Sequence, residues 1–257
     1  FSEKLPFEGS YGNLPPLTVS VNTNPSPGRI LLCSQLFGAY NSNIQIVNND
    51  GSVYRSDDRG GFAIHFERHK SGVFTIYENE IYYQLDSNFN KVDSFYCGNG
   101  YTTDQRDVVL LNNGHALVMA YDPQPYDMSL IYPGGNPNAT VVGLIVQEID
   151  ENKNVVFQWS SWDVFDILDG RFGSFTNSFV DPFHGNAIED DSDGNIIFSS
   201  RNSYEITKIS RSTGDIIWRF GGGHNQFTYA NDTIPFQGQH NVSRLENGNI
   251  TIFDNGN

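Results

Sequence analysis

The sequence predicts an all-β protein, and in particular a β-propeller of four-stranded antiparallel blades. The first observation is composition: the 257 residues include 25 glycines, 11 prolines and 28 asparagines, all of which favour turns. The second is that long apolar stripes of helical period are absent, whereas short runs rich in Val, Ile, Phe and Tyr lie between the turns. The third is a repeat in which two turn types alternate along the chain.

The first turn type is a glycine turn followed directly by an apolar strand. Its five glycines lie at positions 28, 72, 114, 194 and 248, so the steps between them are 44, 42, 80 and 54 residues. A step of roughly 40 to 50 residues is typical of one propeller blade. The long step contains two insertions, Tyr121–Thr140 and Trp159–Asp181.

The second turn type is an Asp- or Asn-led turn before another apolar strand, with copies that begin at Asn49, Asp86 and Asp150 and a fourth from Ser212 to Trp218. One turn of each type supplies two hairpins, which together make the four-stranded sheet of a blade. A β-sandwich built from similar hairpins is the alternative, and the regular alternation favours the propeller.

The repeat also predicts how the chain is divided. We expect residues 1–16 to form an irregular lead-in and residues 17–257 to form about four and a half propeller blades, with no second domain. Because the fifth first-type turn has no second-type partner, we expect the chain to end partway through a blade. The open sheet edge would then be covered by further chain, by self-association or by a partner chain.

Charge excludes several kinds of partner. The 15 Lys and Arg against 30 Asp and Glu give a net charge of −15, with no basic run, so we expect no binding to nucleic acid or to an anionic membrane surface. No apolar stretch approaches the roughly 20 residues of a membrane-spanning helix. Residues 1–9 lack the pattern of a signal peptide.

Two cysteines, Cys33 and Cys97, are too few for a disulfide scaffold or a structural zinc site. They either pair, closing a long loop, or remain as two buried free thiols, and the sequence leaves both readings open. Four Asn-x-Ser/Thr sequons are compatible with a secreted protein, although several would arise by chance in so Asn-rich a chain.

No motif in the sequence indicates a metal site. The six histidines form no His-x-His or His-Glu-x-x-His pattern. The segment Asp191-Ser192-Asp193-Gly194-Asn195 resembles the start of a calcium loop, but Asn202 stands where the bidentate Glu belongs. We therefore interpret this segment as a hairpin turn and expect neither metal nor cofactor.

Three residues far apart in sequence are candidates for one site. His184 and His240 each lie where the chain enters a blade strand, and Arg201 lies where a strand ends. Strand ends at one end of a propeller channel gather around its axis, so these side chains are expected to form a compact cationic pocket. Arginine binds tetrahedral oxyanions through two parallel hydrogen bonds, and histidine can protonate a leaving oxygen near neutral pH. The alternative for each residue alone is an ordinary hydrogen-bonded histidine or a surface arginine.

These segments resemble the arylsulfotransferase family of secreted and periplasmic β-propellers. The resemblance runs over most of the chain and is densest in six segments: Val180–Glu189, Gly194–Arg201, Ile206–Ile209, Gly214–Gly222, Gln239-His240 and Asn247–Gly256. Thr103-Asp104 and Leu110–Asp122 also match.

The resemblance implies a six-bladed fold and transfer of a sulfuryl group from an aryl sulfate to a phenol, without a nucleotide cofactor. A histidine would attack sulfur and form a sulfohistidine, from which an acceptor phenolate collects the group. His184, Arg201 and His240 would hold and stabilise the sulfuryl oxygens as the catalytic set. Arg106, Asn186 and Gln239 would contact the substrate. A secreted or periplasmic location is implied as well.

The sequence departs from the family pattern at the expected nucleophile. The resemblance predicts a histidine in a Thr-Asp-x-His context, where this chain reads Thr103-Asp104-Gln105-Arg106-Asp107. A guanidinium has no free lone pair with which to attack sulfur, and a shift of one residue gives Gln105 or Asp107. Two hypotheses follow: an active sulfotransferase that uses another nucleophile, such as His184 or His240, or transfers the group directly; and a non-catalytic extracellular propeller that binds or assembles.

Overall fold

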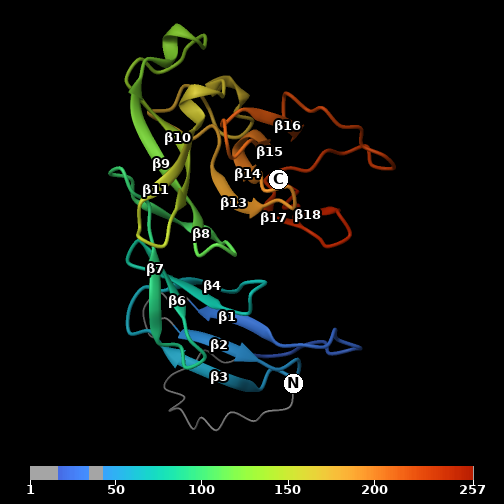
Figure 1. The fold of residues 1–257 in the computed structure, drawn as a ribbon. Helices are drawn as coiled ribbons and strands as arrows, with labels where there is room; N and C mark the ends of the chain where they lie inside the picture. The colour runs from blue at the N-terminus through green and yellow to red at the C-terminus, as the bar shows by residue number, and fades with distance from the viewer. Residues whose placement is uncertain (1–16, 35–42, 257) are drawn as a thin grey trace. The chain divides into compact units, whose positions relative to one another are not determined.

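The computed structural model describes residues 17–34 and 43–256, so the lead-in expected at residues 1–16 lies outside the described residues. The chain divides into two compact units, Phe1–Phe95 and Tyr96–Asn257, which we call the N-terminal and C-terminal units. Each is described by itself. In both, the described secondary structure is almost entirely antiparallel β-sheet (Figure 1).

The N-terminal unit contains two sheets. The first has three strands in the order β1-β2-β3 and the second has four in the order β4-β5-β6-β7. Their bounds are β1 Ile30–Ser34, β2 Asn43–Val47, β3 Val53–Asp58, β4 Ile64–Arg68, β5 Phe74–Glu78, β6 Ile81–Leu85 and β7 Lys91–Phe95. Ile44 from one sheet and Ile76 and Leu85 from the other share one buried core, so the two sheets pack face to face.

The C-terminal unit contains three sheets. Four strands lie in the order β8-β9-β10-β11, with the short β12 beside β10; four lie in the order β13-β14-β15-β16; and β17 pairs with β18. The bounds are β8 Thr103–Leu110, β9 Ala116–Tyr126, β10 Ala139–Ile149, β11 Val155–Ser160, β12 Phe179–Val180, β13 Gly185–Asp190, β14 Ile196–Ser200, β15 Glu205–Ile209, β16 Ile216–Gly221, β17 His240–Arg244 and β18 Ile250–Phe253. The 3₁₀ helices of this unit are η1 Met128–Leu130, η2 Ser161–Asp163, η3 Ile167–Asp169 and η4 Arg201–Ser203.

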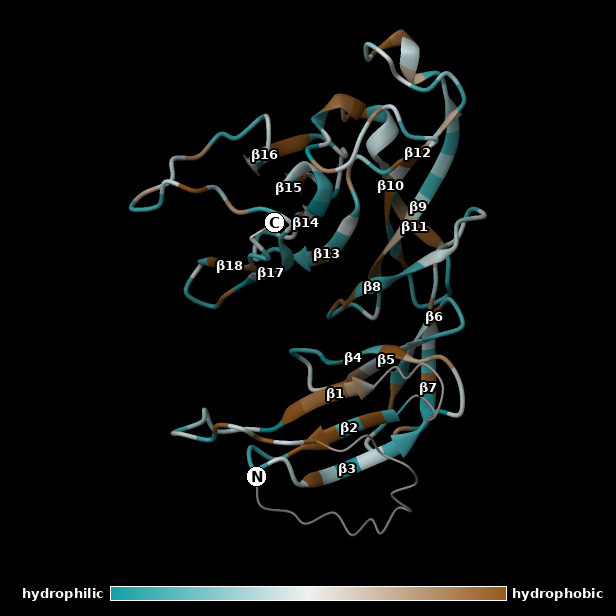
Figure 2. Ribbon diagram, turned by 180° about the vertical axis from the view of Figure 1, so that it is seen from behind, coloured by the Kyte–Doolittle hydropathy of each residue, from teal (hydrophilic) through white to brown (hydrophobic). Residues whose placement is uncertain are grey.

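Two apolar cores hold the three sheets of this unit together. Leu117, Leu144 and Trp159 of the β8–β11 sheet pack against Ile188 and Phe198 of the β13–β16 sheet. A second core joins the β13–β16 sheet to β17 and β18. Figure 2 shows apolar residues in strands such as β1 and β16 and hydrophilic ones in many connecting loops. Stacked, twisted four-stranded antiparallel sheets are the construction of a propeller, and the predicted fold class is confirmed.

The repeated turns explain why these segments form hairpins. Gly72, Gly114, Gly194 and Gly248 lie between β4 and β5, β8 and β9, β13 and β14, and β17 and β18, each with a φ between 80° and 88°. Each donates its N–H to the carbonyl three residues earlier, at distances between 2.8 and 3.1 Å. A left-handed conformation at this position favours glycine, and this requirement gives the repeat its sequence signature. The second-type turns lie between β2 and β3, β6 and β7, β10 and β11, and β15 and β16.

One copy of the repeat differs from expectation. Gly28 precedes β1, but no strand is found before it in the described residues 17–29. Pro25 and Pro27 lie in this segment, and proline lacks the N–H that a ladder of hydrogen bonds requires.

The two insertions extend the β8–β11 sheet. The first lengthens the hairpin of β9 and β10, whose paired residues run from Ala116 with Ile149 to Tyr126 with Ala139. The second forms η2, η3 and β12, and β12 pairs in parallel with β10 at Thr140 and Val141. Both insertions therefore build on one sheet; Tyr121 lies within β9, and Asp181 directly follows β12.

The two cysteines are free thiols and form no disulfide with each other. Cys33 and Cys97 are both unpaired, and the thiol of Cys97 donates to the carbonyl of Met119 at 3.4 Å. Burial raises the pKa of Cys33 to about 11 and that of Cys97 to about 12, so both stay protonated at neutral pH. Separately, the helices found in residues 17–34 and 43–256 are all too short to cross a membrane.

Candidate functional site

The predicted cations His184, Arg201, His240 and Arg106 form one electrostatic cluster in the C-terminal unit. The clearest sign is at His240: burial lowers its pKa, and the positive charges of Arg201, His184 and Arg106 lower it further. Such an effect requires the groups to lie near one another. The structure thus brings together the residues that the sequence placed in one pocket, and we call them the cationic cluster.

Backbone hydrogen bonds join two of these residues directly. The N–H of Arg201 donates to the carbonyl of His184 at 3.1 Å, and that of Asn202 donates to the carbonyl of Phe183 at 2.9 Å. These bonds continue the pairing of β13 with β14 beyond the end of the ladder, where Gly185 lies opposite Ser200. His184 and Arg201 are therefore fixed side by side at the end of two strands.

Asp181 orients the ring of His184. Its Oδ2 lies 2.6 Å from His184 Nδ1, and its Oδ1 accepts the backbone N–H of His184 at 2.9 Å. His184 has a φ of 52°, a left-handed conformation that costs about 1 kcal/mol in a residue with a Cβ. Because the carboxylate occupies Nδ1, the other ring nitrogen, Nε2, is the one free to act on a substrate.

The guanidinium of Arg201 has no carboxylate partner in the described part of the chain. Its Nη1 donates to Oδ1 of Asn202 at 2.9 Å, and the guanidinium lies 4.7 Å from the centre of the Phe172 ring. A half-buried guanidinium without a neutralising acid is unusual in a protein of net charge −15. Its unused N–H groups can bind the oxygens of a sulfate ester.

Arg106 is in a different state from Arg201. Its Nη1 donates to Oδ2 of Asp104 at 2.8 Å, and its backbone N–H donates to Oδ1 of the same carboxylate at 3.0 Å. Burial raises the pKa of Asp104, and the charges of Arg106 and His184 lower it. The pair is nearly neutral overall, so Arg106 contributes less field to the cluster than a free guanidinium would.

His240 is held by its own loop. Its Nδ1 lies 3.0 Å from the carbonyl oxygen of Gly238 and 3.0 Å from the side-chain amide of Asn255. The carbonyl only accepts and the Nδ2 of Asn255 only donates, so Nδ1 can satisfy one of them; a proton on Nδ1 serves the carbonyl and leaves the Asn255 amide without a bond to this nitrogen. This tautomer leaves the lone pair on Nε2, and the lowered pKa keeps the ring neutral at pH 7.

Asn186 and Gln239 lie beneath the cluster. Their side chains are buried, with exposures of 5% and 0%. Asn186 Nδ2 donates to the carbonyl of Gln239 at 2.7 Å, and Gln239 Nε2 lies within 3.1 Å of three oxygens on Ser199, Ser200 and Glu205. These bonds join β17 to the β13–β16 sheet and so position His240 beside Arg201. Substrate contact by either amide stays a prediction.

Tyr121 connects the cluster to an open pocket. Its hydroxyl donates to the carbonyl of Gly185 at 2.9 Å, and its ring centre lies 6.0 Å from that of His184. Burial and the Asp104 carboxylate raise the pKa of Tyr121, so the hydroxyl stays protonated. A pocket of about 490 Å³ is lined by Gly100, Tyr101, Thr102, Thr103, Asp104, Tyr121, Asp122 and Pro123, and we call it the Tyr101 pocket.

A smaller pocket of about 160 Å³ lies on the other side of Asp181. Phe172, Phe175, Phe179 and Val180 give it an apolar wall, and Asn202 belongs to it as well. The N–H groups of Arg171 and Phe172 both donate to the carbonyl of Asn202, so this loop is attached to the residue next to Arg201. The second insertion thus supplies an aromatic surface beside the cluster.

Sequence reasoning assigned no role to Asp181, Asp104 or Phe172. Asp181 carried a signal, because an aspartate three residues before a histidine, with proline between, is typical of a turn closed by the carboxylate. Phe172 carried none, since only the folded loop places it under Arg201. Tyr121 was noted only as part of a Tyr-rich insertion.

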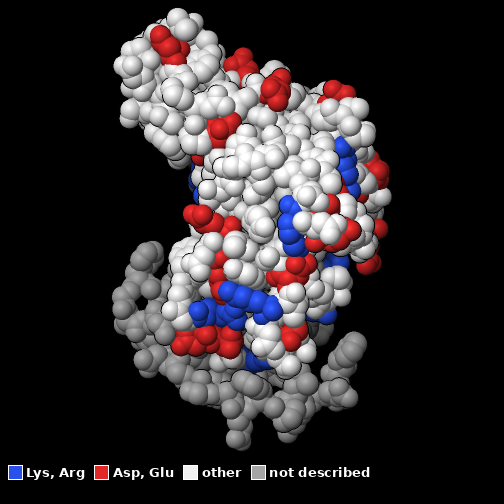
Figure 3. Space-filling model, turned by 60° about the vertical axis from the view of Figure 1, so that its left-hand side comes forward, with Lys and Arg blue, Asp and Glu red and all other residues white. Residues whose placement is uncertain are grey.

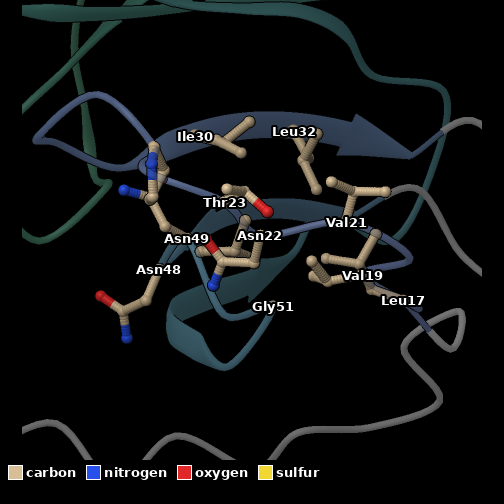
Figure 4. A pocket seen from close by; sticks show the side chains of 12 residues that line it. Leu17, Val19, Val21, Asn22, Thr23, Ile30, Leu32, Asn48, Asn49 and Gly51 are labelled. Atoms are coloured by element: carbon tan, nitrogen blue, oxygen red, sulfur yellow. The ribbon is translucent and has the colours of Figure 1, made fainter.

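A pocket of the N-terminal unit has a different character (Figure 4). It has a volume of about 350 Å³, and its 12 lining residues include no acidic or basic side chain. Leu17, Val19 and Val21 face Ile30 and Leu32 across it. This composition suits packing of residues 17–25 along β1, and it supplies no chemistry.

The turn that resembled a calcium loop is a hairpin turn between β13 and β14. Its two aspartates bind Lys208: the ammonium lies 2.6 Å from Asp191 and 2.7 Å from Asp193. Arg244 also binds Asp191. On the face in Figure 3, acidic side chains are widely scattered and several Lys and Arg lie beside them. Arg201 differs from Lys208 and Arg244, because it has no carboxylate partner among the described residues.

The fold is that of an all-β protein of propeller-type blades, and the cationic cluster lies at strand ends of its C-terminal unit. The sequence profile of the family described as arylsulfotransferase (ASST) matches residues 18–257. The chain belongs to the arylsulfotransferase family. No curated protein sequence matches it significantly.

Solved structures that the chain partly resembles share little sequence with it. A protein of unknown function from Bacteroides caccae is 13% identical, with a TM-score of 0.49 over 87% of this chain and 64% of its own. Virginiamycin B lyase from Staphylococcus aureus is 11% identical, with a TM-score of 0.44 over 90% of this chain and 64% of its own. The chain thus spans 64% of the length of both structures. A streptogramin B lyase is 11% identical, with a TM-score of 0.40 over 92% of this chain and 85% of its own.

Proposed function

We propose that the protein transfers the sulfuryl group of aryl sulfate esters to phenols through His240. The observation that carries this proposal is the neutral, oriented imidazole of His240 among three cations. A nucleophile must present a lone pair, while the sulfate ester it attacks needs positive charge around its oxygens. The cationic cluster offers both in one place.

The first step forms a bond between His240 Nε2 and sulfur. The sulfur–oxygen bond to the aryl group breaks, and its electron pair leaves on the aryl oxygen. Nε2 of His184 is placed to give that oxygen a proton, because Asp181 occupies the opposite ring nitrogen. Arg201 holds the sulfuryl oxygens through its unpaired N–H groups, and its positive charge offsets theirs.

The second step reverses the first with a different phenol. The acceptor gives its hydroxyl proton to His184, its oxygen attacks sulfur, and the nitrogen–sulfur bond returns its electrons to Nε2 of His240. The Phe172 loop and the Tyr101 pocket supply aromatic surfaces for the aryl groups. Secretion or a periplasmic setting, where free aryl sulfates are met, is part of the same proposal.

The experiment is an assay with p-nitrophenyl sulfate as donor and phenol as acceptor. We expect nitrophenol release above the blank, and loss of that release in His240→Ala. Nitrophenol release that persists in His240→Ala but disappears in His184→Ala would indicate His184 as the nucleophile instead. A matched control is His224→Ala, because His224 binds Asp169 at 2.9 Å and has no part in the cationic cluster.

One observation favours a second function, a non-catalytic anion-binding propeller. Arg106 stands at the position where the family resemblance predicts a histidine, and it is paired with Asp104 rather than free. In this case the protein would bind aryl sulfates without cleaving them, and Arg201→Ala would weaken that binding. Arg106→His then tests whether only a nucleophile was missing, since restored turnover would identify the site as a former sulfotransferase centre.

A further inference from the structure

The Tyr101 pocket has the size of a small-molecule site, and it lies directly beside the cationic cluster. Its volume of about 490 Å³ falls within the range usual for such sites. Tyr121 and Asp104 belong to both: Tyr121 faces His184, and Asp104 binds Arg106. A ligand in this pocket can therefore reach the sulfuryl group held by the cluster.

The charge of the pocket is opposite to that of the cluster. Its lining contains two aspartates and no Lys, Arg or His. Asp104 is neutralised by Arg106, but Asp122 accepts only one hydrogen bond in the described residues, from the neutral amide of Gln124 at 2.7 Å. Asp122 thus gives the pocket a net negative charge that no neighbouring cation offsets.

Tyr101, which also lines the pocket, lies within this negative field. Burial raises the pKa of its phenol, and the carboxylates of Asp122 and Asp163 raise it further, so both carboxylates lie near the hydroxyl. Trp162 donates its ring N–H to the backbone carbonyl of Asp122 at 3.2 Å, which fixes the strand at this point. The ring of Tyr101 and the carboxylate of Asp122 are groups that bind an organic cation, whereas the guanidinium of Arg106 already lies 5.6 Å from the centre of the Tyr121 ring.

We propose that this pocket receives the acceptor, and that it selects phenols carrying a protonated amine on a short chain. The phenol hydroxyl would point to the cationic cluster past Tyr121, and the ammonium to Asp122 beside the ring of Tyr101. Neutral phenols fit without this ion pair, and phenols carrying a carboxylate are repelled. The inference rests on the proposed sulfuryl transfer, because it assigns a substrate class to the same site.

The test compares three acceptors of similar size with p-nitrophenyl sulfate as donor: 4-(2-aminoethyl)phenol, 4-ethylphenol and 3-(4-hydroxyphenyl)propanoate. We expect kcat/KM to be about 10-fold higher for the amine than for 4-ethylphenol, and lowest for the carboxylate. Asp122→Asn should remove most of the preference for the amine over 4-ethylphenol. Asp215→Asn removes the same charge from an exposed turn between β15 and β16 and should change nothing.

Binding measured without a donor separates this inference from the proposed function. If the protein has no transferase activity but binds the amine more tightly than 4-ethylphenol, and Asp122→Asn abolishes the difference, the pocket assignment stands and the function fails. If the protein transfers sulfuryl groups equally well to all three acceptors, the function stands and the pocket assignment is wrong. An amine preference that survives in Asp122→Asn also contradicts the assignment.

Discussion

His184 adopts a left-handed backbone conformation, and the two oxygens of Asp181 hold both its backbone and its ring. This is the kind of local strain that persists only where surrounding bonds determine it. The consequence is chemical as well as conformational, because one carboxylate determines which ring nitrogen faces the substrate.

Asp181→Asn should therefore lower activity more than stability. An amide can still accept the backbone N–H but no longer stabilises a charged ring, so proton transfer to the leaving aryl oxygen weakens. We expect kcat to fall about 100-fold with p-nitrophenyl sulfate while KM changes little. A donor with a better leaving group needs less protonation and should lose less, which a purely structural defect would not produce.

The pH dependence of the reaction reports on His240. Burial and the charges of Arg201, His184 and Arg106 lower its pKa, so the neutral nucleophile persists below the ordinary histidine value of 6.5. As pH falls through the lowered pKa, His240 is protonated and kcat/KM declines. The acid limb of the profile should therefore lie below pH 6.5.

Removal of Arg201 should move the acid limb of the pH profile to higher pH. In Arg201→Gln the largest of the three repelling charges is lost, so the pKa of His240 rises and the acid limb moves to higher pH. Arg106→Gln should move it the same way but less, because Arg106 exerts the weakest of the three effects and is paired with Asp104. A limb that stays in place in both variants would exclude His240 as the titrating group.

The hairpin turns and the side-chain bonds between sheets determine how the strands are arranged. The repeat of two turn types predicted most of the hairpins, because a positive φ at one turn position demands glycine and leaves a mark in the sequence. It failed at Gly28, where the prolines of the preceding segment oppose pairing. The length of β9 and β10 and the parallel pairing of β12 left no comparable mark, since they depend on contacts within the insertions.

Asp191 links two sheets through Lys208 of β15 and Arg244 of β17. Its side chain is 1% exposed and that of Lys208 is 8% exposed. Burial raises the pKa of Asp191, but the hydrogen bonds from Arg244 and Lys208 outweigh it and hold the pKa well below 3.8. The carboxylate therefore stabilises the fold above about pH 4, and this contribution is lost as pH falls toward the lowered pKa.

Lys208→Met should destabilise the protein by about 3 kcal/mol at pH 7, because Asp191 loses one of its two cations in a buried position. Urea unfolding monitored by tryptophan fluorescence gives the difference. The difference in the free energy of unfolding between wild type and variant should decrease below pH 4, because Asp191 becomes protonated. Lys70→Met, at an exposed residue of the turn between β4 and β5, serves as the control for loss of a lysine.

At the scale of the whole molecule, the sequence predicted the class of fold and the group of cations, but not how each is held. His184, Arg201 and His240 could be grouped because they share positions at strand ends. The neutral pair of Arg106 with Asp104 and the unpaired charge of Arg201 could not be predicted, because they depend on which carboxylates the folded chain places nearby. The burial of Asn186 and Gln239 was missed for the same reason.

The net charge of −15 should affect the binding of the two proposed substrates differently. Anionic aryl sulfates are repelled by the surface as a whole and attracted only by the cationic cluster, whereas phenolic amines are attracted by both the surface and the Tyr101 pocket. Binding of donor and acceptor should therefore respond oppositely to salt.

The most direct measurement of the central claim is the mass of the protein after brief incubation with p-nitrophenyl sulfate and no acceptor. The account predicts that the intact chain gains one sulfuryl group, that peptide mapping at alkaline pH locates it on His240, and that added phenol removes it. Free nitrophenol released in a burst equal to the enzyme concentration should accompany the gain. Turnover without any modified protein, or a sulfuryl group on another residue with His240 unmodified, would contradict the account.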